Sequence, residues 1–531
     1  MAPAKLPAAV CTPDQRMSTI VKFGHTDRER TVVEIAVDMT KCQSYAQCCF
    51  LAPDVFRFEG EEALIYNPNP SDTEWFRVLQ SAAACPVQAI RVGGTHPPLH
   101  PADITTPVRP PLTADDHVVI VGASLAGLRA AETVRSAGFT GRLTVIGDEP
   151  YRPYDRPPLS KQVLTGAAGT ATTTLPQAPD LDVDWRLGDG AASLNTDDRV
   201  VVLGGGDRVP YTRLLIATGR RSRPWPNAAE AALDGVFLLR TADDATRLRA
   251  ALDAHPKRVL VIGGGFTGGE VASSCSTLGI PVTVADRGSV PMVKVFGPMI
   301  GEMMADVHRE HGVDLRTGTG VEALLGDDTG HLCGARLTDG TTVDVDIAVV
   351  AIGATPNSAW LDGSGVAHDG GGVHSDSAQH ALATDGEPVS DVFVAGDIAQ
   401  GPNPVAGPGR WTSEHWGAAA GQADTAARNM VLGTNTAYAD VPVFWTMQFG
   451  NVLKAVGEPS LADAAQLAQG SLDDRSGIVT FGRDGRLIGA VAVNQAKWLP
   501  YYQAQIVAGA AFPLPDPTID PPTDATVLSA R

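Results

Sequence analysis

The sequence predicts a multidomain α/β protein in which a small α+β domain precedes two parallel-sheet domains and an α+β closing domain. Three observations lead to this prediction. The chain has 531 residues, more than one hydrophobic core usually organises, so we expect roughly three or four domains. Two segments, which begin at His117 and Arg258, share the order strand, glycine turn, helix, strand. A Pro-rich stretch at residues 94–116 separates the small N-terminal part from both.

Composition and charge exclude several classes of protein. Hydrophobic residues make up 44% of the chain and charged residues 19%, as in an ordinary globular protein. No apolar run reaches the roughly 18 residues that span a bilayer, so we expect no membrane partner. The net charge of −19 would repel phosphates, so we expect no nucleic-acid partner. The N-terminal segment lacks the apolar core of a secretory signal, and we expect a cytoplasmic protein with residues 1–30 as a disordered extension.

The cysteines of the small N-terminal domain are grouped. Cys42, Cys48, Cys49 and Cys85 lie in one short segment, whereas the other three of the seven are scattered. Clustered cysteines in a chain without a secretory signal bind metal more often than they form disulfides. Zinc is the main rival to an iron–sulfur cluster, but zinc prefers four ligands and closely spaced cysteine pairs.

The spacing resembles the bacterial ferredoxin pattern C-x2-C-x2-C followed by a distant C-P. Cys42, Cys48 and Cys85 match three of its positions, and Tyr45 replaces the middle cysteine. Three thiolate ligands favour a [3Fe–4S] cluster, and a [4Fe–4S] cluster that recruits Cys49 is the alternative. Otherwise Cys49 is expected to be a small buried hydrophobe. The segments 52–56 (APDVF) and 84–90 (ACPVQAI) resemble the small ferredoxins that serve bacterial cytochromes P-450, and this resemblance covers roughly residues 32–92.

A proline-rich linker is expected next, at residues 94–116, because its prolines lack backbone donors and favour extended conformations. The first strand–turn–helix unit follows. Its turn places Gly122 at the tight bend, Ser124 at the position that must stay small, and Gly127 where helix and strand pack closely. Asp148 ends the second strand, 26 residues beyond Gly122, and can accept from a ribose hydroxyl. Glu149 is the alternative acceptor.

The second unit matches the complete G-x-G-x-x-G pattern with Gly263, Gly265 and Gly268. Asp286 ends its second strand, 23 residues after Gly263, and an acid at this place favours NAD(H) over NADP(H). Arg287 could contact a 2′-phosphate, so NADP(H) remains the less favoured alternative. One such turn is a weak signal, but two in full strand–helix context predict two dinucleotide sites.

Several later strands complete the pattern. The apolar runs at 346–357 and 391–397 are both expected to return to the first parallel sheet. After residue 433 the pattern changes to alternating strands at 443–449, 476–482 and 486–494 with turn signals between them, followed by a helix at 498–510. An α+β closing domain is therefore predicted.

From His117 onwards the chain resembles the two-dinucleotide flavoprotein reductases, and within them the putidaredoxin-reductase-like branch that serves bacterial oxygenases. The motifs that carry this resemblance are 122–127 (GASLAG), 154–161 (YDRPPLSK), 217–219 (ATG), 239–241 (LRT), 263–270 (GGGFTGGE), 353–357 (GATPN), 395–397 (AGD) and 444–446 (FWT). The RPPLSK segment is the most specific of them. The resemblance implies FAD on the first unit and NAD on the second, in Rossmann-like domains.

The resemblance also implies site residues. It places FAD contacts at Gly122, Ser124, Gly127, Asp148, Lys161, Ala191, Arg240, Asp397 and Trp416. The second glycine unit adds Gly263, Gly265, Gly268 and Asp286 as expected NAD contacts, and Glu270 and Gly353 are further expected cofactor-binding residues. Lys161 and Glu270 are expected to pair beside the flavin where hydride arrives, because burial of either charge alone would be costly.

The predicted domain boundaries are a disordered extension at 1–30, a ferredoxin domain at 31–93, a linker at 94–116, an FAD domain at 117–232 and 351–432, an NAD(P) domain at 233–350 and a C-terminal reductase domain at 433–531.

The expected function is that of an FAD-dependent ferredoxin–NAD(+) reductase fused to its own ferredoxin. Residues 117–219 contain no cysteine, so the redox-active cysteine pair of the disulfide reductases is missing and electrons must leave by another route. NADH is the expected donor, and an oxygenase such as a cytochrome P-450 is the expected acceptor. The alternatives are a flavin-dependent reductase of a small molecule, a non-enzymatic redox sensor, and a chain whose N-terminal domain holds no cluster.

Overall fold

The computed structural model describes residues 107–178 and 181–514 and parts of the N-terminal region, namely 34–37, 47–59, 63–67, 70, 74, 77–78, 81–82, 85 and 89–93. Cys42, Tyr45, the predicted extension at 1–30 and the first part of the predicted linker lie outside these residues. Within the described part of the chain, every helix is too short or too polar to span a bilayer.

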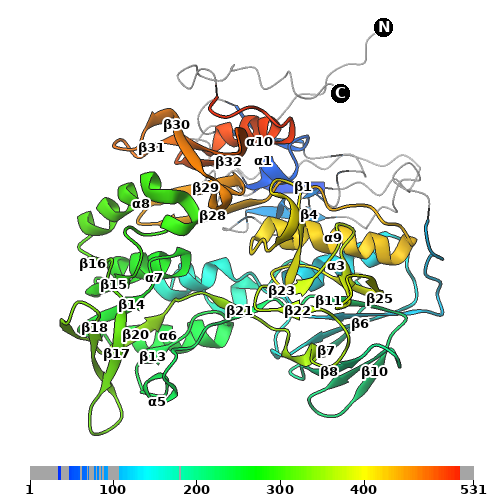
Figure 1. Ribbon diagram of the computed structural model, residues 1–531, viewed down its shortest axis with the longest axis horizontal. Coiled ribbons are helices and arrows are strands. Elements are labelled where there is room, and N and C mark those ends of the chain that lie inside the picture. Colours follow the sequence, from blue (N-terminus) through cyan, green and yellow to red (C-terminus); the bar gives the residue numbers. More distant parts are fainter. Residues whose placement is uncertain are drawn as a thin grey trace, which may run out of the picture.

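The first large sheet has six strands and lies in the lower right of Figure 1. Its spatial order is β24 (His380–Leu382), β25 (Pro388–Val394), β11 (Arg213–Ile216), β5 (His117–Val121), β6 (Arg142–Gly147) and β7 (Asp184–Leu187). The strands from β25 to β7 are parallel. Helices α3 (Leu125–Ser136) and α9 (Trp416–Leu432) share one core with β5, β6, β11 and β25. The predicted return of segment 391–397 to this sheet is confirmed, since β25 pairs with β11.

The second parallel sheet has the order β13 (Val236–Phe237), β20 (Ile347–Val350), β14 (Val259–Ile262), β15 (Val282–Asp286) and β16 (Asp314–Thr317). Helices α6 (Ala242–Asp253) and α7 (Phe266–Thr277) share a core with one face. The antiparallel strands β17 (Val321–Gly326), β18 (Leu332–Leu337) and β19 (Thr342–Asp344) adjoin the other face.

One strand prediction is wrong. The run at 346–357 was expected in the first sheet, but its strand β20 pairs with β14 in the second sheet, with Val259 opposite Ile347. A strand that is apolar on both faces fits either parallel sheet equally well, so its residues do not select the partner. The chain crosses back only afterwards, through β21 (Ala354–Pro356), which pairs with β12 (Arg220–Ser222).

The closing domain is a five-stranded antiparallel sheet, with the order β28 (Val443–Gln448), β29 (Asn451–Gly457), β32 (Arg486–Val493), β31 (Ser476–Arg483) and β30 (Ala464–Ser471). Helix α10 (Leu499–Val507) shares a core with one face, and α8 (Val293–Glu310) of the second parallel-sheet domain shares a core with the other. The predicted α+β pattern after residue 433 is therefore confirmed, and the sheet is packed firmly against the second domain.

Four short strands and a helix are described in the N-terminal region. These are β1 (Glu34–Val37), which pairs with β4 (Ile90–Gly93), and β2 (Phe56–Glu59), which pairs with β3 (Ala63–Tyr66), together with α1 (Gln47–Leu51). They enclose a small core of their own that contains Cys48 and Cys49.

Candidate functional site

The first glycine turn joins β5 to α3. Gly122 has a φ of +126°, and a Cβ there would overlap the carbonyl of Ala217 on the neighbouring strand. A Cβ on Gly127 would overlap the carbonyl oxygen of Gly122. Ser124 is the N-cap residue of the 12-residue helix α3, and its side chain forms no capping hydrogen bond. The turn is thus a backbone cradle at an uncapped helix N-terminus, which fits the pyrophosphate of FAD.

The acids at the end of β6 have different surroundings. Glu149 accepts a 2.6 Å hydrogen bond from the Tyr154 hydroxyl and a 2.7 Å hydrogen bond from Arg156 Nη2. Asp148 is exposed, and it lies against Gly190, next to Ala191 at the start of β8 (Ala191–Asn195). Of the two candidates for the ribose, Asp148 is therefore the one whose carboxylate is open to a ligand.

Arg240 and Asp397, two predicted FAD contacts, lie together, although Asp397 follows β25 of the first sheet and Arg240 follows β13 of the second. Arg240 Nη2 is 2.8 Å from Asp397 Oδ2. Arg156 Nη1 donates to the Arg240 carbonyl at 2.6 Å, and Arg220 Nε donates to the Asp397 carbonyl at 2.9 Å. These contacts bring the segment 154–161 and both strand ends to one place.

Trp416, the first residue of α9, contacts the same segment. Its indole Nε1 donates a 3.2 Å hydrogen bond to Asp155 Oδ1. Burial raises the pKa of Asp155 to about 7, against the opposing effects of this hydrogen bond and of the positive charges on Lys161 and Arg129. Of the predicted FAD contacts, Arg240, Asp397 and Trp416 are therefore linked to segment 154–161.

Lys161 and Glu270 form an ion pair with a distance of 2.7 Å from Nζ to Oε2, and their side chains are only 12% and 8% exposed. Lys161 follows the 3-10 helix at Pro157–Ser160, and Glu270 lies in the first turns of α7. Lys161 Nζ also donates to the Pro157 carbonyl at 2.8 Å. The pair therefore spans the contact between the two parallel-sheet domains.

Two hydroxyl groups complete the surroundings of Glu270. Ser160 Oγ donates to Oε2 at 2.5 Å, and Thr446 Oγ1 of β28 donates to Oε1 at 2.7 Å. Gln448 Nε2 in turn donates to Thr446 Oγ1 at 3.1 Å. Thr446 was part of a motif in the sequence but received no role there. Thr446 shares the buried face of β28 with Phe444 and Gln448. The more apolar residues of this strand alternate with them on the other face, so the sequence pattern did not indicate that Thr446 points inward.

The second glycine turn joins β14 to α7. Gly263 has a φ of +107°, and a Cβ on Gly268 would overlap the Gly263 carbonyl oxygen. A Cβ on Gly265, the N-cap residue, or on Gly353 would meet no atom within 4 Å. Those two positions face open space, as a ligand that approaches the backbone requires.

Asp286 supports this turn from the end of β15. Its carboxylate accepts hydrogen bonds from the backbone nitrogens of Gly264 at 2.6 Å and Gly288 at 2.7 Å. The acid that was predicted to bind the ribose is thus held beside the glycine turn. The arrangement fits the adenosine half of NAD(H), which needs a backbone cradle for phosphate and an acceptor for the ribose hydroxyls.

Cys48 and Cys85, two of the three predicted cluster ligands, belong to the small N-terminal core. Cys85 Sγ accepts a 3.3 Å hydrogen bond from the Ala89 backbone nitrogen. A hydrogen bond with Cys49 lowers the pKa of the Cys48 thiol despite its burial, and Lys454 lowers it further. Sulfurs with amide hydrogen bonds and thiols that ionise readily fit a cluster. The described residues alone contain no group of three metal-ligating side chains, since Cys42 lies outside them.

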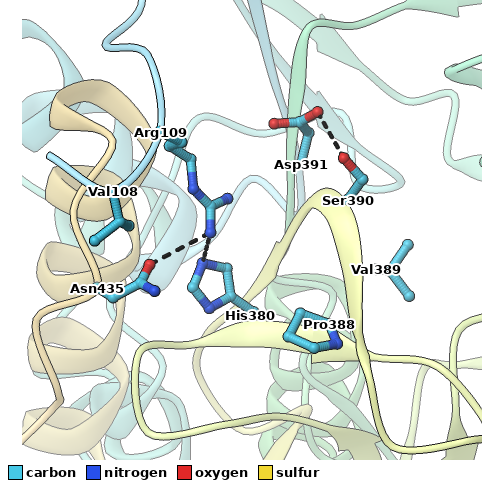
Figure 2. Close-up of a pocket in the computed structure, with 8 residues that line it drawn as sticks. All are labelled: Val108, Arg109, His380, Pro388, Val389, Ser390, Asp391 and Asn435. Carbon is cyan, nitrogen blue, oxygen red and sulfur yellow. Dashed lines mark hydrogen bonds between the residues drawn. The ribbon is translucent and has the colours of Figure 1, made fainter.

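A separate pocket lies where the end of the predicted linker meets the edge of the first sheet. Figure 2 shows Arg109, whose Nη2 lies 2.6 Å from His380 Nε2 and 3.3 Å from Asn435 Oδ1. The backbone nitrogens of Val108 and Arg109 donate to the Gly433 carbonyl. No predicted site residue lines this pocket. Its contacts attach the last part of segment 94–116 to the first parallel-sheet domain.

Comparisons with known proteins agree with this geometry. Residues 116–423 match the family described as pyridine nucleotide-disulphide oxidoreductase, and residues 37–92 match the 4Fe-4S single cluster domain of ferredoxin I. Rhodocoxin reductase of Rhodococcus erythropolis is 33% identical over 420 residues, which cover 78% of this chain and 94% of that protein. The ferredoxin reductase component of chlorobenzene dioxygenase from a Cupriavidus species is 34% identical over 385 residues, which cover 72% of this chain and 90% of that protein.

Solved structures give the same result. The ferredoxin reductase for the CYP199A2 system from Rhodopseudomonas palustris matches with a TM-score of 0.69 and 28% identity, over 75% of this chain and 95% of that chain. The covalent complex of putidaredoxin reductase with putidaredoxin matches with a TM-score of 0.68 and 29% identity, over 75% and 94%. About a quarter of this chain thus lies outside the matched reductases.

Proposed function

The chain belongs to the pyridine nucleotide-disulphide oxidoreductase family, and on that premise we propose that it is an FAD-dependent ferredoxin–NAD(+) reductase with its own iron–sulfur ferredoxin domain. The observation that carries the proposal is the Lys161–Glu270 ion pair, which is buried where the two glycine-turn domains meet. The family match over residues 37–92 supports the ferredoxin domain. Its similarity to the ferredoxin reductase component of chlorobenzene dioxygenase supports an oxygenase system as the destination of the electrons.

The second parallel-sheet domain would bind NADH. The backbone around Gly265 would hold the pyrophosphate at the N-terminus of α7, since this position is open. Asp286 would accept from the adenosine ribose, and Gly353 would let the dinucleotide pass close to the chain. A carboxylate at the ribose disfavours the 2′-phosphate of NADPH through charge repulsion, so we propose NADH as the donor.

The first parallel-sheet domain would bind FAD. The residues that would contact FAD are Gly122, Ser124, Gly127, Asp148, Lys161, Ala191, Arg240, Asp397 and Trp416. FAD, when bound, accepts the hydride of NADH and passes its two electrons on singly. The protein orients the reactants: the Lys161 ammonium is held by Glu270 and the Pro157 carbonyl, so it presents a fixed positive charge and hydrogen-bond donor at the domain contact.

The N-terminal domain would hold the cluster through Cys42, Cys48 and Cys85. We propose a [3Fe–4S] cluster because Tyr45 stands where the ferredoxin pattern has its fourth cysteine, and a [4Fe–4S] cluster is the alternative. Since the domain is tethered to the reductase, its effective concentration at the reductase is high and reduction needs no diffusional encounter. The acceptor beyond the cluster would be an oxygenase, and we propose a cytochrome P-450.

A comparison of two cysteine variants tests this function. The full-length protein is purified without oxygen, and NADH-dependent reduction is measured with ferricyanide, which takes electrons directly from flavin, and with an added bacterial cytochrome P-450. Cys85→Ser should keep the ferricyanide rate and lose cytochrome P-450 reduction. Cys333→Ser, at an exposed cysteine on β18, should keep both. If Cys85→Ser reduces the cytochrome at the wild-type rate, the cluster is not on the path and the proposed function is wrong.

A further inference from the structure

A buried glutamine stands behind the hydrogen bond from Thr446 to Glu270. Gln448, on β28, is 1% exposed, and its amide Nε2 donates to Thr446 Oγ1 at 3.1 Å. The same nitrogen also donates to Met292 Sδ at 3.5 Å. Because the Thr446 hydroxyl oxygen already accepts from this amide, its single hydrogen points to the Glu270 carboxylate. The direction of the hydrogen bond to Glu270 therefore depends on the orientation of the Gln448 amide.

A histidine on another element sets this orientation. His308, near the end of α8, has none of its surface exposed, and its Nε2 lies 3.4 Å from Gln448 Oε1. Burial lowers the pKa of His308 to about 4, against the opposite effect of this hydrogen bond, so the ring is neutral near pH 7 and carries one proton. Since an amide oxygen can only accept, that proton is on Nε2. A half-turn of the Gln448 amide would bring its NH2 group against this N–H group and its oxygen against Thr446.

Packing alone does not explain a histidine at position 308. Its Nδ1 is buried and has no hydrogen-bond partner among the residues that the structure describes. A buried polar atom without a partner destabilises a fold, and such atoms are uncommon in native proteins. The ring packs edge-on against Phe449, with 4.8 Å between the ring centroids, and a phenylalanine could make the same contact. The hydrogen bond from Nε2 is the feature that only the histidine supplies.

A glycine leaves room for the glutamine beside Glu270. Gly269 precedes Glu270 in α7, and a Cβ at this position would overlap Gln448 Oε1. One turn further along α7, Ser273 Oγ accepts a 2.7 Å hydrogen bond from the backbone nitrogen of Phe449. The end of β28 thus lies directly on α7. A residue larger than glycine at position 269 would displace the amide.

We propose that Gln448 and His308 are positioning residues for hydride transfer, which fix the direction of the hydrogen bonds that end at Glu270. This inference rests on the proposed function, because it assumes that the Lys161–Glu270 pair lies where hydride is transferred. The step that the pair serves moves one proton with two electrons from NADH to FAD and leaves NAD+. No proton moves along the chain of hydrogen bonds, whose contribution is to hold the carboxylate in one orientation.

Stopped-flow reduction of the flavin by NADH tests the inference in the full-length protein. Gln448→Met keeps the length of the side chain without its hydrogen bonds. It should lower the rate at saturating NADH about threefold to tenfold, the effect of one neutral hydrogen bond. The dissociation constant for NADH should stay near that of the wild type. Gln466→Met, the same change on β30 at the far edge of the closing sheet, is the matched control and should change neither quantity.

A double variant separates orientation of the carboxylate from a general disturbance of β28. In a Thr446→Val background the hydrogen bond that the Gln448 amide directs is already absent, so Gln448→Met should slow the reaction no further. A loss of the same size in both backgrounds would mean that Gln448 acts through the packing of the sheet, and it would overturn the inference.

Two substitutions on the helices cover the case in which Gln448→Met does not fold. His308→Phe removes the donor together with a buried unpartnered nitrogen, so it should unfold at the same or a higher temperature than the wild type and yet reduce the flavin more slowly. His308→Gln retains a donor and should recover most of the rate. Gly269→Ala should slow the reaction because its methyl group displaces the amide. A wild-type rate in His308→Phe or in Gly269→Ala would overturn the inference. Wild-type flavin that NADH does not reduce would instead refute the proposed function.

Discussion

Thr446 Oγ1 donates a 2.7 Å hydrogen bond to Glu270 Oε1, and this contact ties the closing sheet to the second glycine-turn domain. The other oxygen of Glu270 faces Lys161 and Ser160 of the first domain. The buried Glu270 carboxylate is therefore held from both sides. Ser160 precedes it by 110 positions in the chain, and Thr446 follows it by 176. Its geometry depends on all three domains, which makes it sensitive to single substitutions at either side.

Replacement of Thr446 by valine should slow flavin reduction by NADH about tenfold. The change keeps the shape and removes one hydrogen bond to a buried charge, a loss of about 1–3 kcal/mol, and each 1.4 kcal/mol corresponds to about tenfold. Stopped-flow absorbance of the flavin measures the rate. Thr446→Ser retains the hydroxyl and should react like the wild type. A Thr446→Val rate equal to that of the wild type would show that Glu270 needs no support from the closing domain.

The Lys161–Glu270 pair should show strong coupling in a double-mutant cycle. Glu270→Gln leaves a buried ammonium group without its counter-charge and should lower the free energy of unfolding by about 3–5 kcal/mol. The double variant Lys161→Met/Glu270→Gln should be less destabilised than the sum of the single changes, because no uncompensated charge remains. Urea unfolding followed by tryptophan fluorescence provides the four free energies. Additive effects would mean that the two charges do not interact.

Alanine substitution at two glycines of the second turn should affect different properties, NADH affinity in one case and fold stability in the other. Gly265→Ala places its methyl group in open space, so stability should stay near that of the wild type while NADH affinity falls because the backbone is shielded. Gly268→Ala forces a methyl group into the Gly263 carbonyl and should destabilise the fold itself. Thermal unfolding and NADH titration separate the two effects. Equal loss of stability in both variants would contradict this distinction.

Asp286→Ser should weaken NADH binding and reduce the preference for NADH over NADPH. The variant loses the acceptor for the ribose and the support that Asp286 gives to Gly264 and Gly288. A loss of one or two hydrogen bonds to a charged group corresponds to an increase of about tenfold or more in KM for NADH. Steady-state kinetics with both coenzymes provides the ratio, and Arg287→Ser serves as the comparison. An unchanged coenzyme ratio in Asp286→Ser would place the ribose elsewhere.

Asp155 should make stability depend on pH. Burial raises its pKa to about 7 in the folded protein, whereas an unfolded aspartate titrates near about 3.9. From about pH 4 to 7 the unfolded state releases its proton first, so this group lowers stability as pH rises, by a few kcal/mol at most. Asp155→Asn should therefore gain stability over the wild type across this window.

Urea unfolding of the flavin-free protein at several pH values checks the Asp155 prediction. Asp197→Asn, at an exposed aspartate, is the control and should follow the wild-type pH profile. A constant difference between Asp155→Asn and the wild type from pH 4 to 8 would show that Asp155 has an ordinary pKa.

The two glycine turns illustrate how much of the site can be predicted from sequence. The positive φ at Gly122 and Gly263, and the carbonyl oxygens that exclude a Cβ from Gly127 and Gly268, are constraints within one strand–turn–helix unit. Such local requirements leave a fixed spacing in the sequence. The roles that follow from resemblance, including those of Ala191 and Trp416, remain predictions.

Sequence alone therefore identifies the local units, namely the two glycine turns, the acidic strand ends, the strands of the closing sheet and the grouped cysteines. Which of these units meet is seen only in the three-dimensional structure. It placed β20 in the second sheet rather than the first, and it brought Thr446 to Glu270. A strand that is apolar on both faces can pair with a strand of either sheet, so its residues do not identify its neighbours. A contact between residues that are far apart in the chain produces no regular spacing in the sequence, so no sequence pattern predicts it.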